Sequence, residues 1–386
     1  MCSYVIVGNP DSNRIDFFQQ ALERLEYPPA RIAAWADLLE GRTCLPKIVQ
    51  AGDCVRIESP GRDFDVERLL LAAGAAEAPS GERLSEVEAR NLLFERGRIW
   101  VPYQWYLGLR LALRQIEDQL AECEPHRLTN GLAEIGVMFD KAQTHARLCA
   151  AGVPVPESLP DVRSYGDLTE KLRKAGWGRV FVKLSHGSSA SGVVALRTDG
   201  RRTQATTTVE MARSNGELRL YNSRRLKVYE DASEIAELID ALCRHGVHVE
   251  RWLPKAALNG ASFDLRVVTI GGRARHTVVR QSRSPMTNLH LLNTRGDVEA
   301  VRARMGAAAW AQAMESCERA AKCFPNSLHA GVDLCITPSF RSWAVLEVNA
   351  FGDLLPRVLH DGMDTYEAEI RCVEREKPGE LCILPN

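Results

Sequence analysis

The chain has 386 residues, of which 45% are hydrophobic and 26% are charged, as in globular proteins large enough for two or three domains. Its formal net charge of -1 gives no overall attraction to nucleic acid or to anionic membranes, so neither is expected as a partner. No apolar run approaches the length that crosses a membrane. These numbers exclude the strongly basic and the membrane-spanning classes of protein.

The cysteines indicate a reducing compartment. There are eleven, an odd number, and no two are spaced as Cys-x-x-Cys, which argues against both a disulfide framework and a zinc knuckle. The first residues lack a basic segment and lead directly into an apolar strand, so a signal peptide is not expected. We therefore predict a cytoplasmic protein.

The N-terminal part alternates short apolar strands with amphipathic helices, which predicts a small parallel α/β sheet. The expected strands are residues 4–7, 31–35 and 55–57, and the expected helices are 15–25, 66–73 and 109–120. Pro125 follows the last helix and ends it. We place the first domain boundary there, which gives a domain over residues 1–125.

The middle of the chain predicts a compact α+β unit over residues 126–249. Asp140 precedes a helix that ends at Gly152. Further strands and one helix follow, at residues 179–184, 193–197, 217–221, 226–229 and 232–243. The last domain, 250–386, begins close to a strand at 247–253 and continues with strands at 263–270 and 274–281, joined by Gly271-Gly272. A helix is expected at 307–321.

Three oxygen-bearing side chains fall on two neighbouring strands near the C-terminus. Residues 329–336 and 343–350 should pair as antiparallel strands across a turn, which places Asp333 opposite Glu347 and Asn349 to within about one residue of register. Two carboxylates and an amide carbonyl suit Mg²⁺ or Mn²⁺, whereas zinc favours nitrogen or sulfur. The alternative is a polar strand face open to water.

Two lysines, Lys183 and Lys141, lie at the ends of expected elements. Lys183 ends a buried strand and is followed by a loop of small residues, 185–192, whose amides and hydroxyls can meet phosphate oxygens. Lys141 begins the helix after Asp140. Taken alone, the loop reads equally well as a flexible hairpin tip, and Lys141 as a solvated helix lysine.

A hinge and a charged strand face follow. Glu250, Arg251, Trp252 and Leu253 close the strand after the central unit, where backbone groups can pair with an adenine edge. Asp264 and Arg266 share one face of the next strand, and Arg280 lies on its hairpin partner. Paired arginines usually form a salt-bridged surface, but beside a carboxylate pocket they suit phosphate or carboxylate binding.

In this order, these motifs resemble the ATP-grasp superfamily over about two-thirds of the chain, and most closely the branch of glutathione synthetase and the ribosomal-protein glutamate ligases. The resemblance implies an α/β and α+β protein with an N-terminal Rossmann-like domain, a central lid domain and a C-terminal ATP-grasp domain. It also implies ATP and Mg²⁺ (or Mn²⁺) as cofactors. The implied metal ligands are Asp333, Glu347 and Asn349, and the implied catalytic residues are Arg266 and Arg280.

The same resemblance implies an ATP-binding set and points to a substrate segment. The ATP-binding residues would be Lys141, Lys183, Ser185, Gly187, Ser188, Ser189, Glu250, Arg251, Trp252, Leu253 and Asp264. Substrate residues are expected over the C-terminal hairpin, at Ser284, Asn288, His290 and Arg357. The segment 349–357 departs from the small-Pro-Gly continuation of the ribosomal-protein ligases, so no relative's substrate is carried over.

The implied reaction joins a small-molecule or peptide carboxylate to an amine through an acyl phosphate. A kinase that phosphorylates a small molecule and a nucleotide-binding regulator without turnover remain as alternatives. No general base can be named, because an isolated histidine such as His290 or His360 is more often a packed or surface residue. A homo-oligomer is left open.

Overall fold

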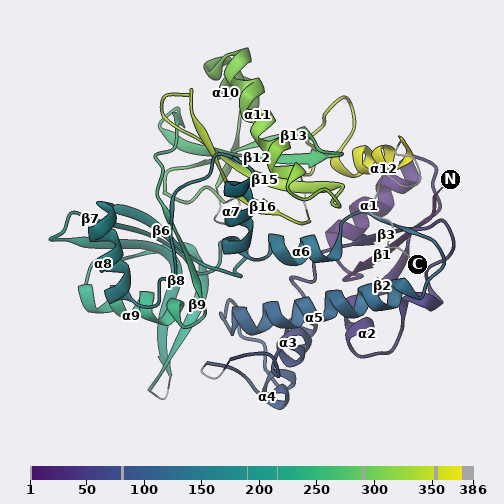
Figure 1. Cartoon of the computed structure of the whole chain (residues 1–386), viewed down its shortest axis with the longest axis horizontal. Coiled ribbons are helices and arrows are strands. Elements are labelled where there is room, and N and C mark those ends of the chain that lie inside the picture. The colour runs from purple at the N-terminus through teal and green to yellow at the C-terminus, as the bar shows by residue number, and fades with distance from the viewer. Residues whose placement is uncertain are drawn as a thin grey trace.

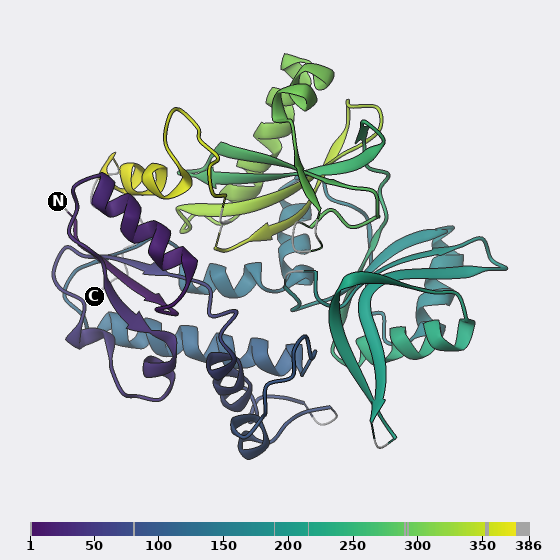
Figure 2. The same cartoon turned by 180° about the vertical axis from the view of Figure 1, so that it is seen from behind.

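Three β-sheets with their helices form three lobes, named here the N-terminal, central and C-terminal lobes (Figure 1 and, from behind, Figure 2). The computed structural model describes residues 2–79, 82–188, 190–214, 216–288, 291, 293–351 and 355–375. Within these ranges no helix combines the length and the apolar character needed to cross a membrane.

The N-terminal lobe is a four-stranded parallel sheet in the order β2-β1-β3-β4, as the alternating sequence pattern predicted. Its strands are β1 (Tyr4–Gly8), β2 (Arg31–Ala34), β3 (Cys54–Ile57) and β4 (Arg127–Leu128). Its helices are α1 (Asn13–Arg24), α2 (Trp35–Leu39), the 3-10 helix η1 (Leu45–Lys47), α3 (Phe64–Ala73), α4 (Glu86–Arg90), α5 (Pro102–Ala121) and α6 (Leu132–Met138). The C-terminal helix α12 (Thr365–Arg375) returns to pack against α1.

The central lobe is a six-stranded antiparallel sheet in the order β5-β10-β6-β7-β8-β9. Its strands are β5 (Ser158–Leu159), β6 (Arg179–Leu184), β7 (Val193–Thr198), β8 (Thr203–Ser214), β9 (Glu217–Tyr229) and β10 (Val247–Arg251). Two helices, α8 (Tyr165–Ala175) and α9 (Ala232–Cys243), pack together on this lobe.

The long β8–β9 hairpin corrects the sequence prediction. Strands expected at 217–221 and 226–229 are one continuous strand, and β8 was not predicted. The polar run between the expected strands includes Asn222, the register partner of Val209, and residues 223–226, which have no partner in the β8–β9 register. Arg224 and Arg225 in this run are exposed, so no apolar alternation marks it as part of a strand. A register shift between Thr207 and Val209 bends the pair.

The C-terminal lobe is an antiparallel sheet in the order β14-β13-β12-β15-β16, with β11 added beside β12. Its strands are β11 (Ala257–Leu258), β12 (Ala261–Ile270), β13 (Arg273–Ser282), β14 (Thr294–Gly296), β15 (His329–Ile336) and β16 (Trp343–Asn349). Gly271 and Gly272 both have positive φ, as the predicted tight turn requires. Helices α10 (Val298–Met305) and α11 (Ala307–Lys322) cover one side of the sheet.

The lobes differ in how their cores are shared. The N-terminal and C-terminal lobes contribute to the same hydrophobic clusters, in which Val5 and Phe263 belong to one and Tyr4 and Ile270 to another. The central lobe packs around a cluster of its own, together with Ile99 from the segment before α5. Helix α7 (Lys141–Ala150) lies where the central lobe meets β16.

Two glycines allow α3 and α5 to touch backbone to backbone. A Cβ on Gly108 would lie 1.8 Å from the carbonyl oxygen of Leu70, and one on Gly74 would lie 2.0 Å from that of Gln104. Gly108→Ala must therefore push the helices apart, and we expect it to lower the free energy of unfolding by about 3 kcal/mol or more.

Gly136 on α6 is the matched control, because the nearest atom to its added Cβ is 4.0 Å away. Gly136→Ala should be neutral or should stabilise by about 0.5 to 1 kcal/mol. Urea unfolding of both variants measures the difference, and equal effects would contradict the close approach.

Candidate active site

The predicted pairing of the last two strands is confirmed. In the β15–β16 ladder, Asp333 is the direct partner of Glu347, and Gly331 is the partner of Asn349. A register irregularity follows Asp333, between it and Leu334. Directly opposite residues point to the same face of a sheet, so the two carboxylates lie side by side. The Asn349 side-chain amide donates to the Gly331 carbonyl at 3.1 Å.

Two arginines from β12 and β13 bind Asp333. Arg266 is the register partner of Asp333 and forms an ion pair with it through Nε. Arg280 Nη2 lies 3.0 Å from the other carboxylate oxygen of Asp333. Both arginines and Asp333 are buried. The structure therefore brings the predicted catalytic arginines to one of the predicted metal ligands.

The predicted lysines meet two glutamates at the junction of the central and C-terminal lobes. Lys183 on β6 forms an ion pair with the buried Glu250 of the adjacent strand β10. Lys141, the first residue of α7, lies 3.0 Å from Glu347 Oε1 and donates at 2.6 Å to the Gly187 carbonyl. Two lysines from separate elements thus face two acids from separate sheets.

These four side chains line one pocket. The other lining residues are Met138, Thr144, His145, Leu148, Val155, His248, Val345 and Leu346, so its wall combines charge with aliphatic surface. Its open volume is about 10 Å³. That volume suits at most one water molecule, whereas ligand pockets usually measure about 300 Å³ or more.

The charges in this pocket shift its pKa values. Burial would lower the pKa of Lys183, but the negative charges of Glu250 and Glu347 outweigh it and the net shift is upward. Burial would raise the pKa of Glu347, but Lys141 and Lys183 lower it to about 2. Both groups are therefore held in their charged forms.

This shift predicts a pH dependence. The folded-state pKa of Glu347 lies below its ordinary value of 4.5, so the ionised carboxylate stabilises the fold above that pH and the contribution is lost as the pH falls toward 2. The destabilisation caused by Glu347→Gln should accordingly be largest above pH 4.5 and should shrink toward pH 2. Urea unfolding of both proteins across this interval measures it, and a constant difference would contradict the ion pairing.

The loop after β6 contacts α7 through its backbone. The Ser185 carbonyl accepts from the Lys141 amide at 3.1 Å, and Ser185 is buried, whereas Ser188 is exposed. His186 was not predicted as a site residue. Its ring stacks on the Tyr106 ring with centroids 4.0 Å apart, and its Nε2 lies 3.2 Å from Asp140 Oδ2. Ser189 lies outside the described residues.

Successive hinge side chains point to opposite faces of the strand. Glu250 points into the pocket, whereas Arg251, its neighbour on β10, points away and lies 2.5 Å from Glu157. The Trp252 ring packs on Phe181, with centroids 5.1 Å apart, and Leu253 is partly buried. Of the four hinge side chains, Glu250 alone is among the residues that line the pocket.

The predicted substrate residues differ in their hydrogen bonds and in their exposure to solvent. Ser284 Oγ donates to the Met286 carbonyl at 3.0 Å, and the Asn288 carbonyl accepts from the side chain of Asn293 at 2.9 Å. Arg357 is exposed, with positive φ, and has no ion pair with a described residue. His290 lies outside the described residues. These assignments remain predictions.

Two residues beside Asp264, Lys255 and Thr287, were not predicted from the sequence. This aspartate is buried and is contacted by Arg280, Lys255 and Thr287. Burial would raise the pKa of Asp264, but Arg280 and Lys255 lower it strongly. Lys255 lies two residues beyond the hinge, and Thr287 lies between the predicted substrate residues Ser284 and Asn288, in the segment called here the substrate loop, so their positions in the sequence were the available signals.

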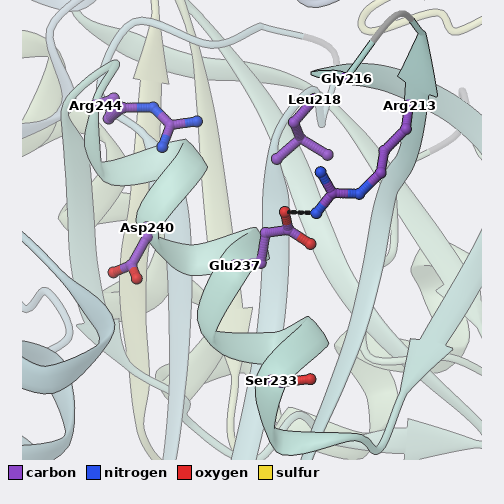
Figure 3. Close-up of a pocket in the computed structure, with 7 residues that line it drawn as sticks. All are labelled: Arg213, Gly216, Leu218, Ser233, Glu237, Asp240 and Arg244. Atoms are coloured by element: carbon purple, nitrogen blue, oxygen red, sulfur yellow. Dashed lines mark hydrogen bonds and ion pairs between the residues drawn. The ribbon is translucent and has the colours of Figure 1, made fainter.

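A second cavity, of about 610 Å³, lies on the central lobe between the β8–β9 hairpin and α9 (Figure 3). Its lining includes an ion pair between Arg213 and Glu237, with Asp240 further along α9 and Arg244 directly after the helix. None of the predicted site residues lines it. Four of the predicted residues, Lys141, Lys183, Glu250 and Glu347, line the pocket at the lobe junction instead.

The chemistry of the donor set fits a hard divalent cation. Asp333, Glu347 and Asn349 carry only oxygen as metal-binding atoms on paired strands, and Mg²⁺ typically takes one or two carboxylates together with water and phosphate oxygens. In this structure Arg266 and Arg280 occupy the two Asp333 oxygens and Lys141 lies 3.0 Å from Glu347 Oε1, so a cation would have to replace some of these contacts. Among the described residues, no group of three or more histidines, cysteines and acidic residues is placed to hold a metal ion. Zinc favours nitrogen and sulfur ligands, so the oxygen-only set of Asp333, Glu347 and Asn349 suits it less well.

No protein-family model and no curated protein matches the sequence. Solved structures match almost the whole chain. The D-cycloserine synthetase DcsG is 13% identical, with 96% of this chain and 98% of that chain covered and a TM-score of 0.54.

Two further structures match over a similar extent. The macrocyclase MdnC, bound with the precursor peptide MdnA from Microcystis aeruginosa, is 11% identical over 97% of this chain and 100% of that chain, with a TM-score of 0.54. The ATP-grasp ligase PsnB, complexed with a minimal precursor, is 16% identical over 97% and 98%, with a TM-score of 0.50. The chain has the ATP-grasp fold, as the sequence predicted.

Proposed function

We propose that the protein is an ATP-dependent ligase that joins a carboxylate to an amine. The solved structures that share its fold are named as a ligase, a synthetase and a macrocyclase; the ligase was determined with a minimal precursor and the macrocyclase with a precursor peptide. A peptide or small-molecule acid is therefore the substrate class we would test first. Membership of the glutathione synthetase and ribosomal-protein ligase branch stays a prediction.

The observation that carries the proposal is the meeting of Lys141, Lys183, Glu250 and Glu347 in one pocket beside Asp333 and its two arginines. Phosphoryl transfer needs positioning and neutralisation of charge more than covalent help from the protein. Fixed ammonium and guanidinium groups supply both.

In the proposed reaction, a carboxylate oxygen of the substrate attacks the γ-phosphorus of ATP, and the bond to the ADP oxygen breaks. The amine then attacks the acyl carbon, phosphate leaves, and the nitrogen loses a proton. Lys141 and Lys183 would hold the phosphates, and Arg280 and Arg266 would orient the carboxylate. Asp333, Glu347 and Asn349 would hold Mg²⁺, which supplies charge neutralisation to the phosphate oxygens.

ATP binding requires the pocket to open. An open volume of about 10 Å³ cannot take a nucleotide, so the two lysines must exchange their glutamate partners for phosphates. The central lobe has its own core, and its outward movement would widen the pocket without exposing the core shared by the other lobes. The central lobe is therefore our candidate for the lid.

The test is ADP release screened over amino acids, short peptides and amines. Acids that give a signal are then incubated with hydroxylamine in place of the amine, because hydroxylamine converts an acyl phosphate into a stable hydroxamate. Hydroxamate formation supports the ligase. A stable phosphorylated product would indicate a kinase, and nucleotide binding without turnover would indicate a regulator.

A further inference from the structure

A buried chain of alternating charges leads from the hinge segment to the candidate metal site. Lys255 lies 3.0 Å from Asp264, Asp264 lies 2.8 Å from Arg280 Nε, and Arg280 Nη2 lies 3.0 Å from Asp333. Arg266 ends the chain on Asp333. Arg280 thus touches an acid at each end of its guanidinium, and its orientation depends on Asp264.

Both carboxylate oxygens of Asp264 are occupied by donors. Arg280 Nε binds Oδ1, whereas Lys255 Nζ and the Thr287 hydroxyl bind Oδ2. Only 2% of Asp264 is exposed, which leaves no carboxylate surface open to a nucleotide ribose. The Asp264 carboxylate therefore interacts with its buried neighbours, and one of these is Arg280.

The Thr287 hydroxyl joins this chain to the expected substrate loop. It donates to Asp264 while accepting from Lys255 Nζ at 2.6 Å, so one oxygen is used both as donor and as acceptor. Thr287 itself is 3% exposed and lies between Ser284 and Asn288 in the chain. The hydroxyl fixes the loop to the same acid that fixes Arg280.

We propose that Lys255, Asp264 and Thr287 form a clamp that positions Arg280 and the loop 283–288 against the carboxylate substrate. This deepens the proposed ligase function and rests on it. The three are positioning residues, because their contacts are with Arg280 and the loop. Removing the hydroxyl should weaken binding of the acid but leave the nucleotide pocket intact, since the Thr287 hydroxyl bonds to Lys255 and Asp264 and Thr287 is not among the residues that line that pocket.

The experiment compares Thr287→Val, which keeps the shape and removes the hydroxyl, with Thr287→Ser, which keeps the hydroxyl. The acid identified by the ADP-release screen is the probe. Thr287→Val should raise the KM for the acid by about tenfold, as loss of hydrogen bonds to charged groups predicts, with the KM for ATP within about twofold of wild type. Thr287→Ser should restore wild-type values. Lys255→Met should show the same split, and Lys174→Met, on the exposed face of α8, is the control.

Hydrogen exchange of the loop 283–288 in the full-length protein supplies a readout without any substrate. Thr287→Val and Lys255→Met should speed exchange there, and Thr287→Ser should not. Unchanged exchange in Thr287→Val, or faster exchange with an unchanged KM for the acid, overturns the clamp. If no acid yields hydroxamate with the wild-type protein, the proposed ligase function fails, and the exchange comparison still decides whether the clamp holds the loop.

Discussion

Replacing Lys183 by alanine should lower ATP-dependent turnover by about 10²-fold or more, the usual cost of removing one preorganised donor to a phosphoryl group. Lys183 is fixed at the end of β6 and its ammonium is held charged in the pocket by Glu250 and Glu347. A shorter side chain at this position cannot reach phosphates that enter the pocket. ADP release at saturating ATP measures the loss.

The same substitution leaves Glu250 buried without its lysine, and breaking a buried ion pair costs about 3 to 5 kcal/mol of stability. A loss of turnover caused by unfolding must therefore be distinguished from a loss caused by the missing ammonium group. A double variant, Lys183→Met with Glu250→Gln, removes both charges at nearly constant shape and should recover the melting temperature without recovering turnover. Lys174→Ala, on the exposed surface of the central lobe, is the matched control. Wild-type turnover in a folded Lys183 variant would refute the assignment of the pocket.

The second large effect is expected at Glu347. Glu347→Gln keeps the shape of the side chain but removes its charge, and the loss of this proposed metal ligand, which pairs with Lys141, should reduce turnover by about 10²-fold or more. Mg²⁺ or Mn²⁺ should support activity, and Zn²⁺ should not replace them, because the ligand set contains only oxygen.

Titration with a chelator provides the independent measurement. Excess chelator should abolish turnover of the wild-type protein, and added Mg²⁺ should restore it. Glu86→Gln is the control, since Glu86 pairs with Arg90 on the exposed surface of α4. Full activity in excess chelator would show that the site at β15 and β16 does not serve the reaction.

Much of the secondary structure follows from local patterns. Helix α7 begins at Lys141 because Asp140 caps it, with its carboxylate accepting from the amides of Ala142 and Gln143 at 3.0 Å. Gly271 and Gly272 fix the turn between β12 and β13. The helix at α9 was predicted with its observed bounds, because its apolar spacing is regular. The β8 strand was missed because an edge hairpin carries polar residues on its open face.

The sequence also determined the pairing of Asp333 with Glu347. Alternation of side chains along two strands joined by a short turn leaves little freedom in register, so Asp333 and Glu347 had to lie close together. The identity of the fold followed from the order of the motifs, and the solved structures bear it out.

Only the tertiary structure decided which charges pair. Lys141 and Glu347 are separated by more than two hundred residues, and Lys183 and Glu250 by more than sixty, so no local pattern could join them. The same holds for Lys255 and Thr287, whose bonds to Asp264 depend on how the hinge segment and the β13–β14 connection fold over β12. Local spacing fixes which face of an element a side chain occupies. The partner it finds there depends on how separate sheets pack, because ion pairs and hydrogen bonds need atoms within about 3 Å.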